Sequence, residues 1–303
     1  QFIYLSIYLS ICLSVCNTMG NLLETPNTEK DTHFLSAPDL GIEVAVSGMQ
    51  GYRPEMEDAH VATRLPSARD HIVLAVFDGH GGKAVSKYLK ENLPQFFVNK
   101  FKKDIYSRPD TASKYFNKVY DLVQNKMKEE HPRAIQYCGS TACVGIHFKD
   151  TDDKQRLWIL NVGDSRAIKC NKLNIAEQLT VDHKPNAPSE KQRIEQLGGK
   201  IEFDGSDWRI KDLSLSRAFG DLECTPYVTH LPQIYRYKIS SSDKFVVFAC
   251  DGLWDVMSNQ DVIDFINELM LNKKFKGNYA KELAEYAFAR GSLDNITTIV
   301  YIL

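Results

Sequence analysis

His71-Ile72-Val73-Leu74-Ala75-Val76-Phe77-Asp78-Gly79-His80-Gly81-Gly82 is the stretch of this sequence that decides the fold. Residues 71 to 77 form a nearly continuous apolar run, which predicts a buried β-strand. Asp78 ends the run, and glycines break the strand before a helical pattern begins at about residue 83. A second such run, Phe245 to Cys250, ends in the same way at Asp251-Gly252. The sequence therefore predicts two buried strands that each place a carboxylate at one end.

The elements around these two strands decide between fold classes. Further strands are expected at residues 43–49, 59–64, 141–148, 156–162, 165–170 and 296–302, with helices at about 83–101, 111–129, 189–198, 258–272 and 279–289. Ser189-Glu190-Lys191-Gln192 and Ser258-Asn259-Gln260-Asp261 are expected to cap their helices, and Gly163-Asp164 is typical of a hairpin. Runs of strands separated by helix pairs argue against a doubly wound parallel sheet. We predict an α+β fold in which two antiparallel sheets pack together with helices outside.

The composition of the 303 residues is that of an ordinary globular protein, with 43% hydrophobic and 25% charged residues. No break in composition divides the chain, so we expect one domain. The net charge of -2 provides no general attraction to nucleic acid or to acidic membranes. The seven cysteines include no C-x-x-C pair, so they indicate neither a zinc site nor a redox motif. They favour a reducing compartment, the cytoplasm or the nucleus.

Residues 1–18 are uncharged and mostly apolar, but they are short for a membrane span and lack the basic start of a signal peptide. Ile-Tyr-Leu-Ser occurs at residues 3–6 and again at 7–10, which is what repeated ATCT encodes. We interpret residues 1–18 as translated sequence upstream of a start at Met19. Gly20 would then be a candidate for myristoylation, although Glu24 stands where the pattern favours Ser or Thr. Only this lipid would give membrane contact. Residues 19–40 are expected to form a flexible lead-in to a domain spanning residues 41–303.

Acidic residues recur at the ends of apolar runs and beside tight turns: Glu57-Asp58, Asp78, Asp251 and Asp294. A single Asp-Gly after a strand is usually a turn. Two buried strands that deliver Asp-Gly at the same end favour a shared site, because a carboxylate at the edge of a core is costly unless it is paired or bound to metal. Oxygen ligands without a Cys or His cluster suit Mg²⁺ or Mn²⁺. Spacing alone does not establish that these residues converge.

Eight motifs then place the sequence beside a known family. They are GYRPEMEDAH at 51–60, FDGHGG at 77–82, GSTA at 139–142, NVGDSRA at 161–167, LTVDHKP at 179–185, LSRAFGD at 215–221, ACDGLWD at 249–255 and DNIT at 294–297. From about residue 42 to the end, the chain resembles the PPM family, the metal-dependent (type 2C) protein serine/threonine phosphatases. The resemblance implies a four-layer αββα fold, a central β-sandwich flanked by helix pairs, with a metal-dependent phosphatase domain over residues 41–303.

The resemblance also implies a role for each matched residue. Asp78 would bridge two Mg²⁺ or Mn²⁺ ions, with Glu57 and the Gly79 carbonyl completing one site and Asp251 and Asp294 the other. Asp58 would orient metal-bound water. Asp164 and Asp255 match residues linked in some family members to a third, weaker metal ion.

The resemblance implies hydrolysis of phosphorylated proteins. We expect a monomer that does not act on nucleic acid, for which the charge balance gives no support. Arg53 would hold phosphate oxygens, since its guanidinium can bind them in a bidentate way. His80 would protonate the leaving serine or threonine oxygen; a structural hydrogen bond is its alternative. A catalytically inactive scaffold with the same fold, and another two-metal phosphoesterase such as a nuclease, are the rival classes. The scaffold is disfavoured because every matched ligand is present, and the nuclease because the charge balance indicates no basic groove.

The sequence departs from the family pattern just before LSRAFGD. Many relatives carry a glycine between an Arg-Val pair and the leucine, whereas residues 208–214 here read Trp-Arg-Ile-Lys-Asp-Leu-Ser. The departure follows residues 183–207, which by resemblance form a flap beside the active site. Either substrate or partner choice differs from that of relatives, with Lys211 at the altered position, or the loop has drifted without effect.

Overall fold

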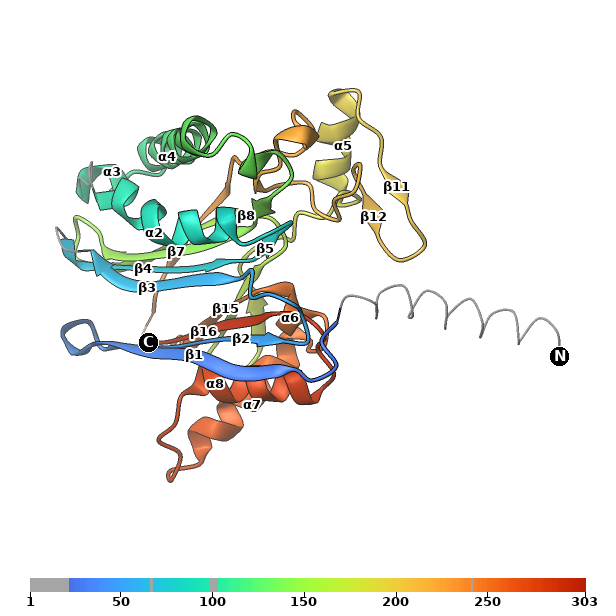
Figure 1. The fold of residues 1–303 in the computed structure, drawn as a ribbon. Coiled ribbons are helices and arrows are strands. Elements are labelled where there is room, and N and C mark those ends of the chain that lie inside the picture. Colours follow the sequence, from blue (N-terminus) through green and yellow to red (C-terminus); the bar gives the residue numbers. More distant parts are fainter. Residues whose placement is uncertain (1–21, 66–67, 99–102, 241) are drawn as a thin grey trace.

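Two antiparallel β-sheets stacked face to face form the centre of the protein in the computed structural model, which describes residues 22–65, 68–98, 103–240 and 242–303 (Figure 1). The first sheet has the order β1-β2-β16-β15-β9-β10 and the second the order β14-β8-β7-β4-β3. The first comprises β1 (Asn27–Ala37), β2 (Ile42–Gly51), β16 (Ile296–Ile302), β15 (Phe245–Ala249), β9 (Arg166–Cys170) and β10 (Ala176–Gln178). The second comprises β14 (Gln233–Lys238), β8 (Gln155–Val162), β7 (Ala142–Lys149), β4 (Ala68–Phe77) and β3 (Ala59–Leu65).

Helices cover the outer face of each sheet, so the molecule has four layers (Figure 1). α2 (Ala84–Val98), α3 (Lys103–Ser107) and α4 (Pro109–Glu130) lie over the second sheet, and α7 (Asn259–Leu271) and α8 (Tyr279–Ala289) lie under the first. The short α6 (Asp251–Trp254) follows β15 directly. The predicted α+β sandwich with flanking helices is therefore confirmed. No helix of the described residues is long and apolar enough to cross a membrane.

Three apolar cores hold the layers together. The inter-sheet core includes Val46, Leu74, Val76 and Phe248, all essentially inaccessible to solvent. One outer core lies between the second sheet and α2 and α4, and the other between the first sheet and α7 and α8. Because both faces of the central strands are buried, β15 and residues 72–77 of β4 are apolar throughout, which explains the continuous runs in the sequence.

The expectation that residues 19–40 form a flexible lead-in is wrong for residues 27–37. These residues are β1, which pairs with β2 from Lys30 opposite Met49 to Ala37 opposite Ile42. Their polar character reflects the position of β1 at the edge of its sheet, where one face meets solvent and only part of the other is covered. Residues 1–21, on which the upstream-segment and Gly20 predictions fall, lie outside the described residues.

Two local predictions are wrong and one is confirmed. Gly163-Asp164 does not join a hairpin, because β8 and β9 belong to different sheets and the chain crosses the sandwich between them. α5 (Pro188–Gln196) has no side-chain cap; Pro188 is its first residue, and the Glu190 carboxylate pairs with arginines instead. α7 has the expected capping box between Ser258 and Asp261.

A small lobe lies beside one end of the sandwich (Figure 1). It contains α5, the hairpin of β11 (Glu202–Phe203) and β12 (Trp208–Arg209), and a separate apolar cluster that includes Ile194 and Ile210. The segment that lacks the family glycine forms a tight turn, in which Ile210 and Leu213 exchange backbone hydrogen bonds. Lys211 adopts a left-handed backbone with φ of 54° in this turn. A sheet of β5 (Gly79–His80), β6 (Gly139–Ser140) and β13 (Phe219–Gly220) connects the lobe to the sandwich.

Candidate active site

Three carboxylates meet at the end of the sandwich beside this lobe. One oxygen from each of Asp78, Asp164 and Asp251 lies within 4.8 Å of the others. Asp78 follows β4, Asp164 lies in the crossing from β8 to β9, and Asp251 begins α6 after β15. The two buried strands thus deliver their Asp-Gly sequences to one place, since β4 and β15 lie in facing sheets and end on the same side.

The backbone around Asp78 leaves no room for larger residues. The Asp78 amide donates to Thr141 Oγ1 at 3.0 Å, and its carbonyl accepts from the Thr141 amide at 2.9 Å. At Gly79 a Cβ would collide with the backbone carbonyl of Glu57. The Glu57 amide in turn donates to Asn295 Oδ1 at 2.8 Å. Close packing therefore fixes Glu57 against Gly79, the residue that follows Asp78.

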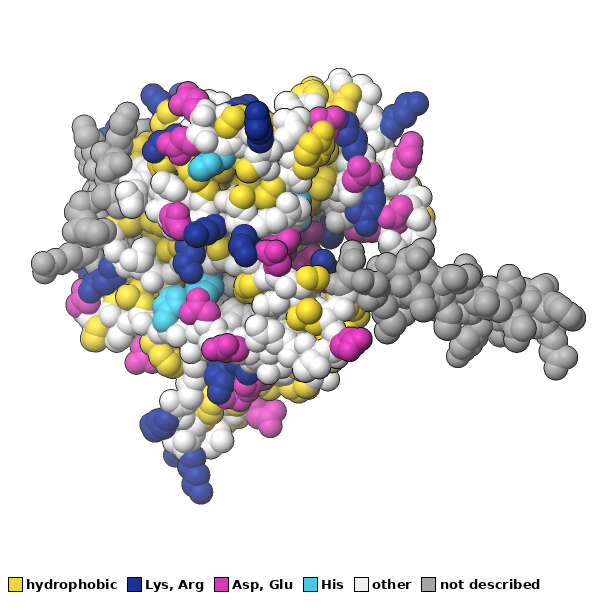
Figure 2. Space-filling view, in the orientation of Figure 1, with side chains coloured by type: hydrophobic (Ala, Val, Ile, Leu, Met, Phe, Trp, Pro, Cys, Tyr) yellow, Lys and Arg dark blue, Asp and Glu magenta, His cyan; other side chains and the backbone are white. Residues whose placement is uncertain are grey.

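A cavity of about 510 Å³ opens onto the carboxylates. Its walls bring together most of the predicted site residues and part of the lobe: Arg53, Glu57, Asp78, Gly79, His80, Asp164, Asp251 and Asp294, with Arg209, Asp212 and Leu213 opposite. Figure 2 shows acidic side chains gathered in a hollow beside the lobe. The altered segment of the lobe is therefore a wall of the cavity.

Three predicted residues lie in positions that the sequence did not indicate. Arg53 forms an ion pair with Asp294, with Nη2 2.5 Å from Oδ2, so the two residues assigned to phosphate and metal contact each other. Asp255 lines a neighbouring cavity with Asp294 rather than the main one. Asp58 lies behind the carboxylates, and its Oδ2 is buried without a hydrogen bond.

Burial and mutual repulsion disfavour the ionised forms of these carboxylates. Burial, followed by the charges of Asp251, Asp58 and Asp164, raises the pKa of Asp78 well above its usual range. Burial, followed by Asp164 and Asp294, does the same to the pKa of Asp251. Burial is also the main reason that the pKa of Asp58 rises to about 7. A divalent cation removes this penalty, because its charge favours the ionised form of every carboxylate around it.

The donor set fits a hard divalent cation. It consists of carboxylate oxygens, which are ligands that Mg²⁺ and Mn²⁺ prefer. No histidine or cysteine belongs to the three-residue cluster of Asp78, Asp164 and Asp251.

Two residues that contact the candidate site, Asp221 and Lys184, were not singled out from the sequence, although both lie in quoted motifs. His80 Nε2 is 2.6 Å from Oδ2 of Asp221, which is 3% exposed. Burial lowers the pKa of His80, but the hydrogen bond and charge of Asp221 outweigh it and the pKa is raised. Lys184 Nζ donates to Asp164 Oδ2 at 2.6 Å, so a cation of the protein already contacts the acidic cluster. The signal for Asp221 was the LSRAFGD motif, and the signal for Lys184 was the LTVDHKP motif.

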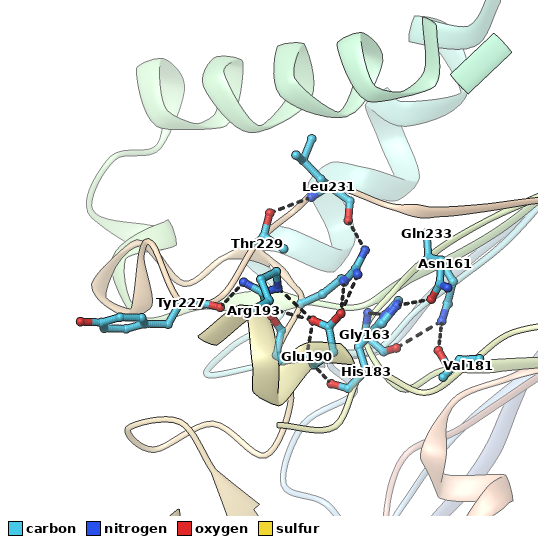
Figure 3. Close-up of polar contacts among 12 residues, drawn as sticks. Asn161, Gly163, Val181, His183, Glu190, Arg193, Tyr227, Thr229, Leu231 and Gln233 are labelled. Carbon is cyan, nitrogen blue, oxygen red and sulfur yellow. Dashed lines mark hydrogen bonds and ion pairs between the residues drawn. The ribbon is translucent and has the colours of Figure 1, made fainter. Parts of the chain in front are cut away.

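A polar network links the lobe to Gly163, the residue before Asp164 (Figure 3). The Glu190 carboxylate, 2% exposed, accepts hydrogen bonds from Arg193, Ser216 and Arg217. Ser216 Oγ also donates to the His183 carbonyl at 2.9 Å. Two hydrogen bonds join His183 to Gly163. The Gly163 amide donates to His183 Nδ1 at 3.1 Å, and the Gly163 carbonyl accepts from the His183 amide at 3.0 Å. The network therefore fixes the backbone next to Asp164.

Comparison with known proteins identifies the family of the chain. The family model described as Protein phosphatase 2C matches residues 42–296. A probable protein phosphatase 2C of Oryza sativa subsp. japonica is 38% identical over 259 residues, which are 84% of this chain and 75% of the relative. One from Paramecium tetraurelia is 32% identical over 312 residues, 94% of this chain and 99% of the relative. A phosphatase structure from Toxoplasma gondii superposes with a TM-score of 0.77 at 22% identity over 91% of this chain and 96% of its own, which shows the shared fold.

An acidic cluster at the end of a four-layer αββα sandwich defines a class of metal-dependent phosphatases. The chain belongs to the protein phosphatase 2C family, the type 2C branch of the metal-dependent protein serine/threonine phosphatases. The family resemblance, the fold and the enzyme class expected from the sequence are thereby confirmed.

Proposed function

We propose that this protein hydrolyses phosphoserine and phosphothreonine in proteins with water as the nucleophile, using two Mg²⁺ or Mn²⁺ ions. The convergence of Asp78, Asp164 and Asp251 within 4.8 Å carries the proposal. Asp78, Glu57 and the Gly79 carbonyl would hold one ion, and Asp78, Asp251 and Asp294 the other, with a weaker third site at Asp164 and Asp255. Bound ions of this kind supply a water of lowered pKa and neutralise charge on the phosphoryl group.

The side chains around the ions supply the remaining steps. Arg53 lies at the cavity wall and is half exposed, so its guanidinium can leave Asp294 and bind phosphate oxygens. Water attacks phosphorus as the bond to the serine or threonine oxygen breaks, and that oxygen needs a proton. Asp221 holds Nε2 of His80, which leaves Nδ1 to deliver the proton. Asp221 is therefore a positioning residue for His80.

Metal removal tests the proposal directly. We expect a phosphothreonine peptide to release phosphate in Mn²⁺ or Mg²⁺, to stop doing so in EDTA, and to resume when the metal is restored. An inactive scaffold would release no phosphate under any condition. A nuclease would instead cleave a phosphodiester such as bis(p-nitrophenyl) phosphate as fast as the peptide. Either result would contradict the proposal.

Replacing Asp221 tests how His80 works. Asp221→Asn removes the charge that raises the pKa of His80, so the protonated imidazole should be lost at lower pH. Because a general acid must be protonated, we expect the alkaline fall in kcat to move to lower pH, with kcat near neutrality reduced about 10- to 100-fold. The pH profile of kcat against a phosphopeptide measures both. An unchanged profile would mean that the pair is only structural.

We also propose a monomer located in the cytoplasm or nucleus, with membrane contact only through an acylated Gly20. What supports the reducing compartment is that the five cysteines of the described residues are all buried free thiols. Phosphorylated proteins are the expected partners, and nucleic acid is not. The lobe residues that line the cavity, including Arg209 and Asp212, are where we expect substrate choice to be made.

A further inference from the structure

A second group of potential metal ligands lies at the open edge of the sandwich, where the two sheets end together, and Asp58 lines the same cavity. β1 is the edge strand of the first sheet and β3 the edge strand of the second. Asp31 and His33 are two residues apart on β1, so their side chains leave the same face. His33 lies opposite Val46, and His60 of β3 lies opposite Val76, both in the inter-sheet core. All three side chains therefore point between the sheets at the open edge.

The spacing of these side chains suits a metal ion. One ligand atom from each of Asp31, His33 and His60 lies within 4.8 Å of the others. His60 Nε2 is 3.5 Å from Asp31 Oδ2, longer than an ordinary hydrogen bond. Two ligands at about 2.1 Å from a tetrahedral ion lie about 3.4 Å apart. The His33 and His60 rings are stacked with their centroids 5.2 Å apart, and a nitrogen of each lies within 4.8 Å of an Asp31 oxygen.

One nitrogen of the buried His60 imidazole has no hydrogen-bond partner. The His60 side chain is 4% exposed, and its Nδ1 is buried without a partner. The His60 ring packs close to Gly48, because a Cβ at position 48 would lie 3.4 Å from Nδ1. No hydrogen bond fixes the tautomer, so either nitrogen can present its lone pair. Such a ring is costly to bury unless something binds it.

Both histidines have a pKa below the ordinary value for an imidazole. Burial, followed by the charge of Lys90, lowers the pKa of His60 to about 4. Burial also lowers the pKa of His33, against the opposing effect of Asp31.

The cluster is open to solvent. Asp31 and His60 line a cavity of about 300 Å³ between the edge strands, and Lys90 of α2 lines it as well. Figure 2 shows histidine side chains gathered on the face over β1 and β3, next to an acidic side chain. An ion can enter here directly. The exposed Lys90 opposes a cation, and its replacement gives a sensitive test.

We propose that Asp31, His33 and His60 bind one divalent transition-metal ion of the Zn²⁺ class, which joins β1 to β3 across the open edge of the sandwich. Two imidazoles and one carboxylate favour such an ion over Mg²⁺, which prefers oxygen ligands. The site is therefore chemically distinct from the acidic centre. Three protein ligands leave a fourth position for water.

Zinc titration of the full chain tests the proposal. Asp78→Asn and Asp251→Asn are introduced together to weaken the acidic centre, and Mg²⁺ is kept in excess. Calorimetry with Zn²⁺ is expected to show one bound equivalent, and X-ray absorption to show imidazole ligands. His33→Ala should weaken binding at least about 100-fold, because loss of a direct ligand exceeds loss of a supporting contact. His131→Ala, at an exposed histidine elsewhere, should leave it unchanged.

Two further variants sharpen the result without altering the buried His60. Asp31→Asn should weaken Zn²⁺ binding, and Lys90→Gln should tighten it by removing a nearby positive charge. Zn²⁺ should raise Tm in the parent protein and in His131→Ala, but not in His33→Ala. Equal zinc affinity in the parent and His33→Ala, or equal loss in His131→Ala, would overturn the proposal. All of these readouts are independent of phosphatase activity.

Discussion

Asp78→Asn is expected to reduce phosphatase activity by about 1,000-fold or more, and at the same time to stabilise the protein in the presence of a chelator. Asp78 is the carboxylate that both proposed ions share, so its loss removes several kcal/mol of transition-state stabilisation, at 1.36 kcal/mol per factor of ten. Phosphopeptide turnover at saturating Mn²⁺ measures this loss. Near-wild-type rates would contradict the assignment of Asp78.

The stabilisation follows from the raised pKa of Asp78. A carboxyl whose pKa is higher in the folded protein than in the unfolded chain destabilises the fold once pH rises above its unfolded pKa. Asn removes that charge, so in EDTA near neutral pH we expect a gain on the order of 1 kcal/mol. Thermal unfolding with and without metal separates the two effects. In buffer that contains Mn²⁺, Asp78→Asn should instead show a smaller metal-induced rise in Tm than the wild-type protein.

Two companion variants establish that the effect belongs to the site. Asp251→Asn should cost about as much activity, and the double variant little more, because residues that act as a unit are not additive. Asp152→Asn changes an exposed carboxylate in the turn between β7 and β8 and should alter neither activity nor stability. A similar activity loss in Asp152→Asn would show that the assay reports general damage.

Glu190→Gln is expected to destabilise the folded protein by about 3 kcal/mol, the cost of breaking a buried ion pair from one side. The Glu190 carboxylate faces Arg193 and Arg217, with Nη2 atoms at 2.9 Å and 2.6 Å. Gln keeps the shape but leaves both guanidinium groups without a countercharge. Urea unfolding measures the loss. Because the network reaches Gly163, we also expect a weaker metal affinity at Asp164.

The matched control for Glu190 lies on the same helix. Glu195→Gln removes an exposed carboxylate 3.8 Å from Lys191 and should change stability by less than about 0.5 kcal/mol. Burial raises the pKa of Glu190, but Arg217 and Arg193 outweigh it and lower the pKa to about 2. Its stabilising effect is therefore present above the unfolded pKa near 4 and is lost as pH falls towards 2. Equal stability of the two variants would refute this account.

The sequence predicted some elements well because their signals are local. Apolar runs marked β4 and β15, and the Ser258 and Asp261 side chains marked the start of α7. β1 was missed because an edge strand can be polar on most positions, so it resembles a loop. Gly163-Asp164 was read as a hairpin because a turn sequence does not reveal whether the next strand stays in the same sheet.

Part of the candidate site could likewise be predicted from local sequence, and part could not. The sequence by itself determined the fold class, the two strands that end in Asp78 and Asp251, and the residue types able to hold a divalent ion. Only the tertiary structure decided that Asp164 joins those two aspartates, that Asp221 holds His80, and that Arg53 contacts Asp294. Local patterns specify a strand and its end because side-chain periodicity repeats within a few residues. Contacts between residues from facing sheets depend on how the layers pack, and no short stretch of sequence encodes that.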